Sequence, residues 1–157
     1  MDSLLVQQTS ALLDKENPVG SLSNLCSFLQ YEMEHLNWVG FYFWKNNRLE
    51  LAMFSGKPAC AYLPLDKGVC AKAFRENETI VVDDVLSFPT HIACDSASRS
   101  EIVIPLRLDN RPIGVLDIDS DIASRFGKEE KTLFEEIAKI IEKSIDLQGF
   151  DGFLFSF

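Results

Sequence analysis

The chain has 157 residues, of which 46% are hydrophobic and 25% charged, values that suit one folded domain with a single core. Its formal net charge of -9 repels phosphate backbones and anionic lipid, and its Lys and Arg residues are dispersed. The sequence therefore argues against nucleic-acid and membrane-surface roles, and we expect one domain over residues 1–157.

The N-terminal segment MDSLLVQQTSALLDKENP has acids where a secretory signal would have bases. No apolar stretch approaches the ~20 residues that a membrane span needs. We therefore expect a cytoplasmic protein, in which the four cysteines are free thiols, metal ligands or redox catalysts rather than structural disulfides.

The first elements of the chain are expected to be helical. Residues 2–14 have apolar side chains at helical spacing and end before Asn17 and Pro18. Residues 20–36 are typical of a longer amphipathic helix. Its apolar face would carry Leu22, Leu25, Cys26, Leu29 and Met33.

The remaining elements are mostly strands. The aromatic run NWVGFYFW (37–44) predicts a strand that turns at Asn46 and Asn47 into a second strand, RLELAMF. Further along, the sequence predicts a loop over 56–68, a short helix in GVCAKAFREN and a strand in TIVVDD. After irregular structure over 86–100, it predicts a hairpin formed by EIVIPLRL and PIGVLDID. The last predicted element is a helix over about 128–146. This order indicates an α+β fold, with a central antiparallel sheet and helices packed on it.

Carboxylates gather at one end of the predicted hairpin. In LDID, Asp117 and Asp119 point to the same side of the strand. If a three-residue loop joins the two strands, Leu108 pairs with Pro112, which places Glu101 across from Asp119. Val103 would then lie across from Asp117. Like charges that face one another need a cation or a shared proton, and crowding raises at least one carboxyl pKa. The alternative is a solvated polar face at the sheet edge.

Aromatic residues of the first strand divide between its two faces. Trp38, Gly40, Tyr42 and Trp44 share one face, and Val39, Phe41 and Phe43 share the other. The face with Trp38 and Tyr42 would line a small pocket with an apolar wall and polar handles. The alternative is that helices cover both faces and all of these residues are core.

The cysteines fall into two groups. Cys26 lies on an apolar helix face and is expected to be a buried small hydrophobe. Cys60, Cys70 and Cys94 lie beside Gly, Pro, Asp or Ser and are expected to be exposed. Cys70 would start a helix, where the helix dipole favours a thiolate. The acids would instead raise the pKa of the Cys94 thiol, whereas the positive charge of Arg99 would lower it, and the sequence does not determine which effect is larger.

Several chemistries lack support in the sequence. The cysteines show no C-x-x-C spacing, and His91 has no partners at ligand spacing, so we expect no metal site. The glycine-containing pieces match neither a P-loop nor G-x-G-x-x-G, which argues against nucleotide hydrolysis.

Together, the segments NWVGFYFW, GKPAC, GVC, HIACDSASRSEIVIPL and IGVLDIDS resemble the GAF-domain enzymes that reduce free methionine-(R)-sulfoxide. The resemblance runs from about Asn37 to Ser120, and the helices before and after suit the family's fold. The run HIACDSASRSE is too long and unusual for a chance match.

The resemblance implies a role for each candidate residue. Cys94 would be the nucleophile, and Cys60 and Cys70 the thiols that resolve the oxidised enzyme. The remaining site residues would bind substrate: Trp38 and Tyr42 around the methyl-sulfoxide end, and Glu101, Asp117 and Asp119 at the ammonium and the sulfoxide oxygen. The family implies no cofactor, an external reductant such as thioredoxin, and a possible homodimer.

The residues agree with this chemistry. A sulfoxide oxygen leaves only when protonated, and a crowded acid cluster supplies a neutral carboxylic acid. The attacked cysteine becomes a sulfenic acid, and a second thiol condenses with it to a disulfide. The small-residue run DSASRS would bind the substrate carboxylate through its backbone N–H groups. Two alternatives remain: a GAF sensor that binds a small ligand without chemistry, and a thiol redox switch.

Overall fold

The structure is a computed structural model that describes residues 3–89, 97–145 and 147. Its helices are α1 (Ser3–Leu12), α2 (Pro18–Glu32), α3 (Val69–Glu76) and α4 (Lys128–Ser144), with a 3₁₀ turn η1 (Val85–Ser87). None of the helices in these ranges is long and apolar enough to cross a membrane.

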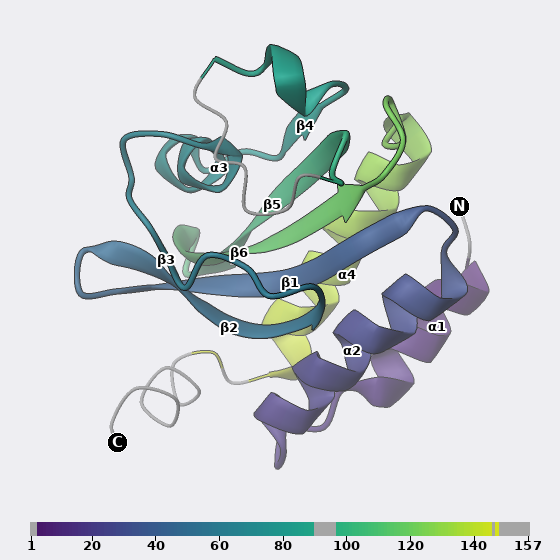
Figure 1. The fold of residues 1–157 in the computed structure, drawn as a ribbon. Helices are drawn as coiled ribbons and strands as arrows, with labels where there is room; N and C mark the ends of the chain where they lie inside the picture. Colours follow the sequence, from purple (N-terminus) through teal and green to yellow (C-terminus); the bar gives the residue numbers. More distant parts are fainter. Residues whose placement is uncertain (1–2, 90–96, 146, 148–157) are drawn as a thin grey trace.

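The strands form one antiparallel sheet. They are β1 (Leu36–Lys45), β2 (Arg48–Gly56), β3 (Tyr62–Leu63), β4 (Ile80–Val82), β5 (Ser100–Leu108) and β6 (Arg111–Ser120), in the spatial order β3-β2-β1-β6-β5-β4. The long strands β1 and β6 therefore occupy the centre, and the short strands β3 and β4 form the edges (Figure 1). This arrangement confirms the expected α+β fold with helices packed on an antiparallel sheet.

The two faces of the sheet carry different layers. Helices α1, α2 and α4 cover one face, which we call the core face, and α3 lies over the opposite face, which we call the pocket face (Figure 1). Strand alternation explains the division, because Phe41 and Phe43 of β1 point to the core face while Trp38 and Tyr42 point to the pocket face. The structure thus confirms the predicted assignment of these side chains to the two faces of the strand.

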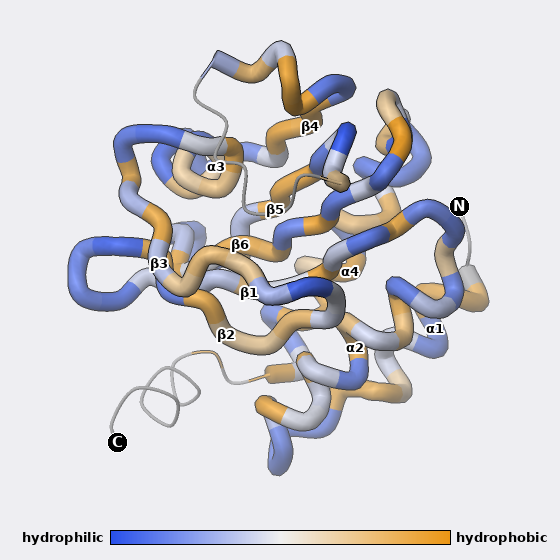
Figure 2. The backbone as a smooth tube through the Cα atoms, in the orientation of Figure 1, coloured by the Kyte–Doolittle hydropathy of each residue, from blue (hydrophilic) through white to orange (hydrophobic). Residues whose placement is uncertain are grey.

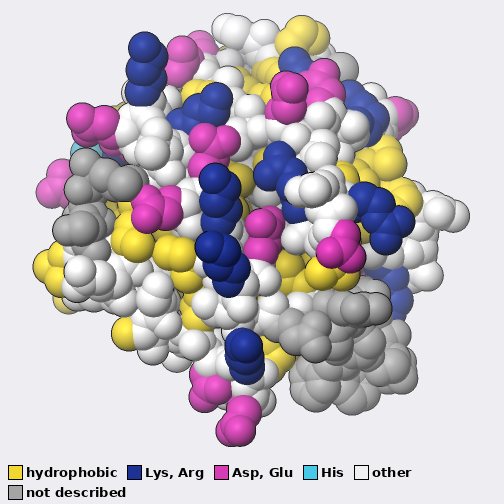
Figure 3. Space-filling model, turned by 180° about the vertical axis from the view of Figure 1, so that it is seen from behind, with side chains coloured by type: hydrophobic (Ala, Val, Ile, Leu, Met, Phe, Trp, Pro, Cys, Tyr) yellow, Lys and Arg dark blue, Asp and Glu magenta, His cyan; other side chains and the backbone are white. Residues whose placement is uncertain are grey.

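Hydrophobic residues are concentrated in the central strands, and hydrophilic residues in the turns (Figure 2). Figure 2 shows hydrophobic segments along the central strands and a hydrophilic tip at the β1–β2 hairpin. That tip is the two-residue turn at Asn46 and Asn47, whose φ values of 55° and 60° match the left-handed conformation favoured in tight hairpins. Figure 3 shows Lys and Arg side chains interspersed with Asp and Glu on the far side, as the dispersed charges of the sequence suggested.

Some predicted boundaries are wrong. Helix α2 ends at Glu32 rather than at 36, because Met33 already has extended backbone that leads into β1. The loop expected over 56–68 contains the short strand β3, whose two residues pair with Leu49 and Glu50 of β2. A two-residue edge strand is too short to produce a recognisable pattern in the sequence.

Candidate active site

The carboxylates meet on neighbouring strands. In the β5–β6 pair, Glu101 lies opposite Asp119, and Val103 lies opposite Asp117, as expected. The expected loop is nevertheless wrong. The turn contains only Asp109 and Asn110, so that Leu108 pairs with Arg111 and not with Pro112.

A β-bulge between Leu106 and Arg107 corrects the register. Arg107 pairs with Pro112 and Leu106 with Gly114, which leaves Ile113 as the extra residue on β6. The bulge offsets the shorter turn, and for this reason the predicted pairing of the acids is right although the predicted loop length is not.

A pocket opens between the pocket face of the sheet and α3. Most of the predicted site residues line it: Trp38, Tyr42, Cys70, Glu101, Asp117 and Asp119. They come from β1, α3, β5 and β6, so the fold joins residues that are far apart in the sequence. The alternative in which the aromatic face is core is correct in part, because Trp38 and Tyr42 are each only 2% exposed and pack in a buried cluster with α3 while they also line the pocket.

The acids lie inside this pocket rather than at a solvated edge. Glu101 and Asp117 are each only 6% exposed, which contradicts the alternative of a solvated polar face. Burial raises the pKa of Glu101 well above its usual range, and the charges of Asp117 and Asp119 raise it further. The sequence predicted a raised pKa for at least one crowded carboxyl group, and Glu101 is such a group.

Cys70 differs from its predicted environment. It lies in the first turn of α3, as expected, but its side chain is 5% exposed rather than open to solvent. Burial and the nearby charges of Asp117 and Glu101 raise the pKa of the Cys70 thiol well above its usual value. The expectation of a thiolate at this position is wrong, because desolvation and neighbouring carboxylates outweigh the helix dipole.

Three of these side chains are close enough to share a metal ion. Cys70, Glu101 and Asp117 each offer one ligand atom, and these atoms lie within 4.8 Å of one another. These residues show no metal-ligand spacing in the sequence, because they come from three separate elements, α3, β5 and β6. A cation of another kind, such as an ammonium group, also suits this cluster of acids.

The other cysteines have distinct states. Cys26 is a fully buried free thiol on the core face, as expected, and burial raises its pKa. Cys60 is half-buried and disulfide-bonded. Of the three states expected for the cysteines, only a redox-active thiol is compatible with this bond. Cys94 and His91 lie outside the described residues.

The aromatic wall of the pocket is held by hydrogen bonds. The indole Nε1 of Trp38 donates to the carbonyl of Lys57 at 3.1 Å, and the hydroxyl of Tyr42 donates to the carbonyl of Cys60 at 2.8 Å. The Trp38 ring stacks on Phe54 with 5.5 Å between centroids. Gly40 leaves the space for this stack, because a Cβ there would lie only 2.6 Å from Cβ of Phe54.

Two polar lining residues were missed as site residues. Lys67 and Ser98 both line the pocket. Ser98 belongs to the run DSASRS, which the sequence did single out, and its hydroxyl accepts a hydrogen bond of 3.1 Å from Nδ2 of Asn37. Lys67 lies in the loop before α3, and nothing in its sequence neighbourhood distinguished it from a surface lysine.

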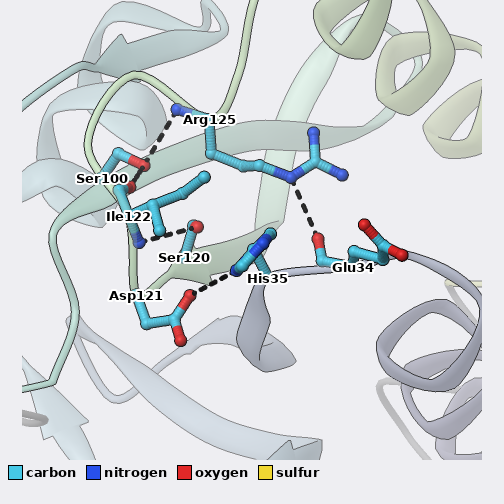
Figure 4. Close-up of polar contacts among 7 residues, drawn as sticks. All are labelled: Glu34, His35, Ser100, Ser120, Asp121, Ile122 and Arg125. Carbon is cyan, nitrogen blue, oxygen red and sulfur yellow. Dashed lines mark hydrogen bonds and ion pairs between the residues drawn. The ribbon is translucent and has the colours of Figure 1, made fainter.

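A group of hydrogen bonds fixes the ends of the acid-bearing strands (Figure 4). The buried hydroxyl of Ser100 donates to the carbonyl of Ile122 at 2.6 Å and accepts from the backbone N–H of Arg125 at 3.3 Å. The hydroxyl of Ser120 accepts from the N–H of Ile122 at 3.2 Å. Because Ser100 and Ser120 adjoin Glu101 and Asp119, these bonds hold both acids in register.

The loop after β6 also contacts the turn between α2 and β1. Nε of Arg125 donates to the carbonyl of Glu34 at 3.0 Å, and Nδ1 of His35 lies 3.4 Å from the carboxylate of Asp121 (Figure 4). His35 lies in the turn before β1 with a left-handed φ of 62°.

Comparisons with known proteins identify the family to which the chain belongs. A model of the GAF domain family matches residues 16–145. Free methionine-R-sulfoxide reductase from Escherichia coli is 37% identical over 155 residues, which cover 99% of this chain and 90% of that protein.

Two solved structures have closely similar folds. The reduced form of fRMsr from Staphylococcus aureus matches with a TM-score of 0.86 and 46% identity, over 90% of this chain and 93% of that one. Free methionine-R-sulfoxide reductase from Neisseria meningitidis, in complex with its substrate, matches with a TM-score of 0.85 and 40% identity, over 89% of this chain and 85% of that one.

Proposed function

Because the chain belongs to the GAF-domain family of free methionine-R-sulfoxide reductases, we propose that it reduces free L-methionine-(R)-sulfoxide to methionine. One observation supports this reaction above the alternatives. Glu101, Asp117 and Asp119 meet an aromatic wall and a thiol in one pocket, as an enzyme for a small zwitterionic sulfoxide requires. A sensor or a redox switch leaves this combination unexplained.

The substrate's ammonium group binds the carboxylates of Asp117 and Asp119. A positive group relieves the repulsion among buried acids, whereas the uncharged nitrogen of a peptide bond does not. This difference favours the free amino acid over methionine sulfoxide within a protein. Trp38 and Tyr42 enclose the methyl-sulfoxide end, because their rings supply the apolar wall of the pocket.

Glu101 supplies the proton to the sulfoxide oxygen. Its raised pKa keeps the carboxyl group protonated near neutral pH, so that it donates a hydrogen bond as the sulfur–oxygen bond breaks. The neighbouring acids that bind the ammonium also maintain this raised pKa. Binding and acid catalysis therefore rely on the same cluster.

Cys94 is the nucleophile. Its sulfur attacks the substrate sulfur, the oxygen passes to the cysteine, and methionine leaves with the protein as a sulfenic acid. The thiol of Cys60 then attacks the sulfenic sulfur, which forms a disulfide and releases water. An external dithiol such as thioredoxin reduces this disulfide and is itself oxidised.

Cys60 is preferred over Cys70 as the resolving thiol. Among the cysteines that the structure describes, Cys60 is disulfide-bonded, and Cys70 is a buried free thiol whose raised pKa makes it a poor attacking group. Cys70 instead contributes to the wall of the substrate pocket.

Turnover of racemic free methionine sulfoxide with thioredoxin recycling tests the function. The wild-type protein is expected to consume only the R epimer, and Cys94→Ser neither epimer, with the products resolved on a chiral column. If the wild-type protein consumes neither epimer, the proposal is wrong and the pocket serves ligand binding.

A matched set of cysteine variants tests the assignment of the resolving thiol. Cys60→Ser is expected to lose thioredoxin-dependent turnover, while Cys70→Ser keeps the recycling step. Cys26→Ala serves as the control, because this thiol lies on the core face away from the pocket. If Cys70→Ser loses recycling and Cys60→Ser keeps it, Cys70 and not Cys60 is the resolving thiol.

A further inference from the structure

The loop that carries Cys60 depends on hydrogen bonds from other segments. Residues 57–61 connect β2 to β3 and contain neither helix nor strand. The carbonyls of Lys57 and Cys60 accept bonds from the side chains of Trp38 and Tyr42, at 3.1 and 2.8 Å. The carbonyl of Ala61 accepts a bond of 2.9 Å from the N–H of Leu51. The residues that form the pocket wall thus also anchor this loop.

The bond from Tyr42 reaches Cys60 itself. The Tyr42 side chain is 2% exposed, and burial, with the charge of Asp117 next, raises the pKa of its hydroxyl. The Tyr42 hydroxyl therefore remains protonated near neutral pH and acts as a hydrogen-bond donor. Its ring lines the pocket and stacks with Trp38, so the ring and the hydroxyl contact different parts of the protein.

We propose that Tyr42 is a positioning residue for Cys60: its hydroxyl holds the Cys60 backbone where the thiol can form and keep its disulfide. The sulfenic acid in this step rests on the proposed function, whereas the effect on the disulfide itself does not. A disulfide requires a narrow range of Cα separations and dihedral angles. A backbone held in place raises the effective concentration of the thiol and favours the bond.

The Cys60 thiol attacks the sulfur of the Cys94 sulfenic acid, a sulfur–sulfur bond forms, and the sulfur–oxygen bond breaks. The hydroxyl leaves with the thiol proton as water. Tyr42 exchanges no proton in this step and acts only through the position of the Cys60 backbone.

Equilibration with glutathione tests the proposal without any sulfoxide. Removing one buried hydrogen bond changes an equilibrium by roughly tenfold. Tyr42→Phe is therefore expected to lower the ratio of disulfide to dithiol at Cys60 about tenfold, which makes the reduction potential about 30 mV less negative. Mass spectrometry of alkylated peptides that contain Cys60 gives this ratio.

The matched control is Tyr62→Phe, which removes a hydroxyl close to the same loop. Tyr62 is 56% exposed and its ring contacts Arg48 rather than the pocket. This variant should keep the wild-type disulfide ratio. An unchanged ratio in Tyr42→Phe, or an equal change in both variants, would overturn the proposal. Thermal unfolding of the reduced proteins separates a change in potential from a general loss of stability.

Single-turnover kinetics give a second measurement. In Tyr42→Phe, disulfide formation should slow about tenfold more than methionine formation, and sulfenic acid should accumulate as a dimedone adduct. Equal slowing of both steps would show that the hydroxyl acts on the substrate instead. If the wild-type protein forms no methionine, the proposed function fails, but the glutathione measurement still decides the role of Tyr42.

Discussion

The two faces of the sheet are equally buried but differ in the chemistry they bury. On the core face, Phe41, Leu116 and Phe134 are fully buried among other apolar side chains. On the pocket face, Glu101 and Asp117 are each 6% exposed beside aromatic rings and a thiol. The same strands therefore build a core on one side and a reactive site on the other.

The difference shows what each face contributes. Apolar burial on the core face stabilises the fold, because each buried ring removes a large apolar area from water. Crowded acids on the pocket face oppose folding, because burial without a cation disfavours their charged forms. Stability and function should consequently respond to different substitutions.

The largest expected effect comes from the core face. Phe41→Ala removes a fully buried ring and should lower the free energy of unfolding by about 3–5 kcal/mol. Urea denaturation measures this loss. The KM of the remaining folded protein should stay near the wild-type value, because Phe41 points away from the pocket. Phe41→Leu, with a smaller loss, is the control, and a large change in KM for Phe41→Ala would contradict the separation of the faces.

Glu101→Gln should have the opposite effects on activity and stability. The amide cannot donate an acidic proton, so turnover should fall by about 10²–10³. For the same reason, wild-type turnover should fall as the pH rises through the raised pKa of Glu101. Initial rates measured across pH test both statements, and turnover by the variant near the wild-type rate would exclude Glu101 as the proton donor.

The stability of the same variant has a definite dependence on pH. Because the pKa of Glu101 is higher in the folded than in the unfolded state, its stabilising contribution is complete below the unfolded pKa and is lost as the pH rises through the folded pKa. The Gln side chain does not titrate, so its contribution to stability does not change with pH. The variant should therefore be more stable than the wild type by on the order of 1 kcal/mol at about pH 8, and less so at about pH 5.

Much of this division of faces could be predicted from alternation alone. The sequence NWVGFYFW assigns Phe41 and Phe43 to one side and Trp38 and Tyr42 to the other, because side chains alternate along a strand. The acids of LDID follow the same rule. Local patterns of this kind also predicted the main helices and the sheet.

Other features depend on tertiary contacts and could not be predicted. The burial of Cys70 results from the packing of α3 on the sheet, which places the thiol among carboxylates from two other elements. The bulge at Leu106 and Arg107 has no local signature, although it determines which residue faces Asp119. The hydrogen bond from Tyr42 to Cys60 joins residues 18 positions apart.

Gly40→Ala should affect the pocket face more than the core face. The added methyl group displaces the Trp38 ring or Phe54, which lies 2.6 Å from the new Cβ. Because Trp38 forms the wall around the methyl-sulfoxide end, KM should rise about tenfold with a loss of about 1–3 kcal/mol in stability. Steady-state kinetics measure the KM. An unchanged KM would show that substrate binding does not depend on the position of the Trp38 ring.

The smallest expected effect lies where the acid-bearing strands end. Ser100→Ala removes the bonds to Ile122 and Arg125 and should lower the free energy of unfolding by about 1–2 kcal/mol. Since Ser100 adjoins Glu101, the loss should be accompanied by a lower kcat, because the acid is less firmly held against Asp119. Ser55→Ala is the control, since that hydroxyl bonds to Gln30 of α2 and not to the segments that Ser100 joins. If both variants lose stability but neither changes kcat, the bonds around Ser100 support the fold alone, and the acids keep their register through the β5–β6 ladder.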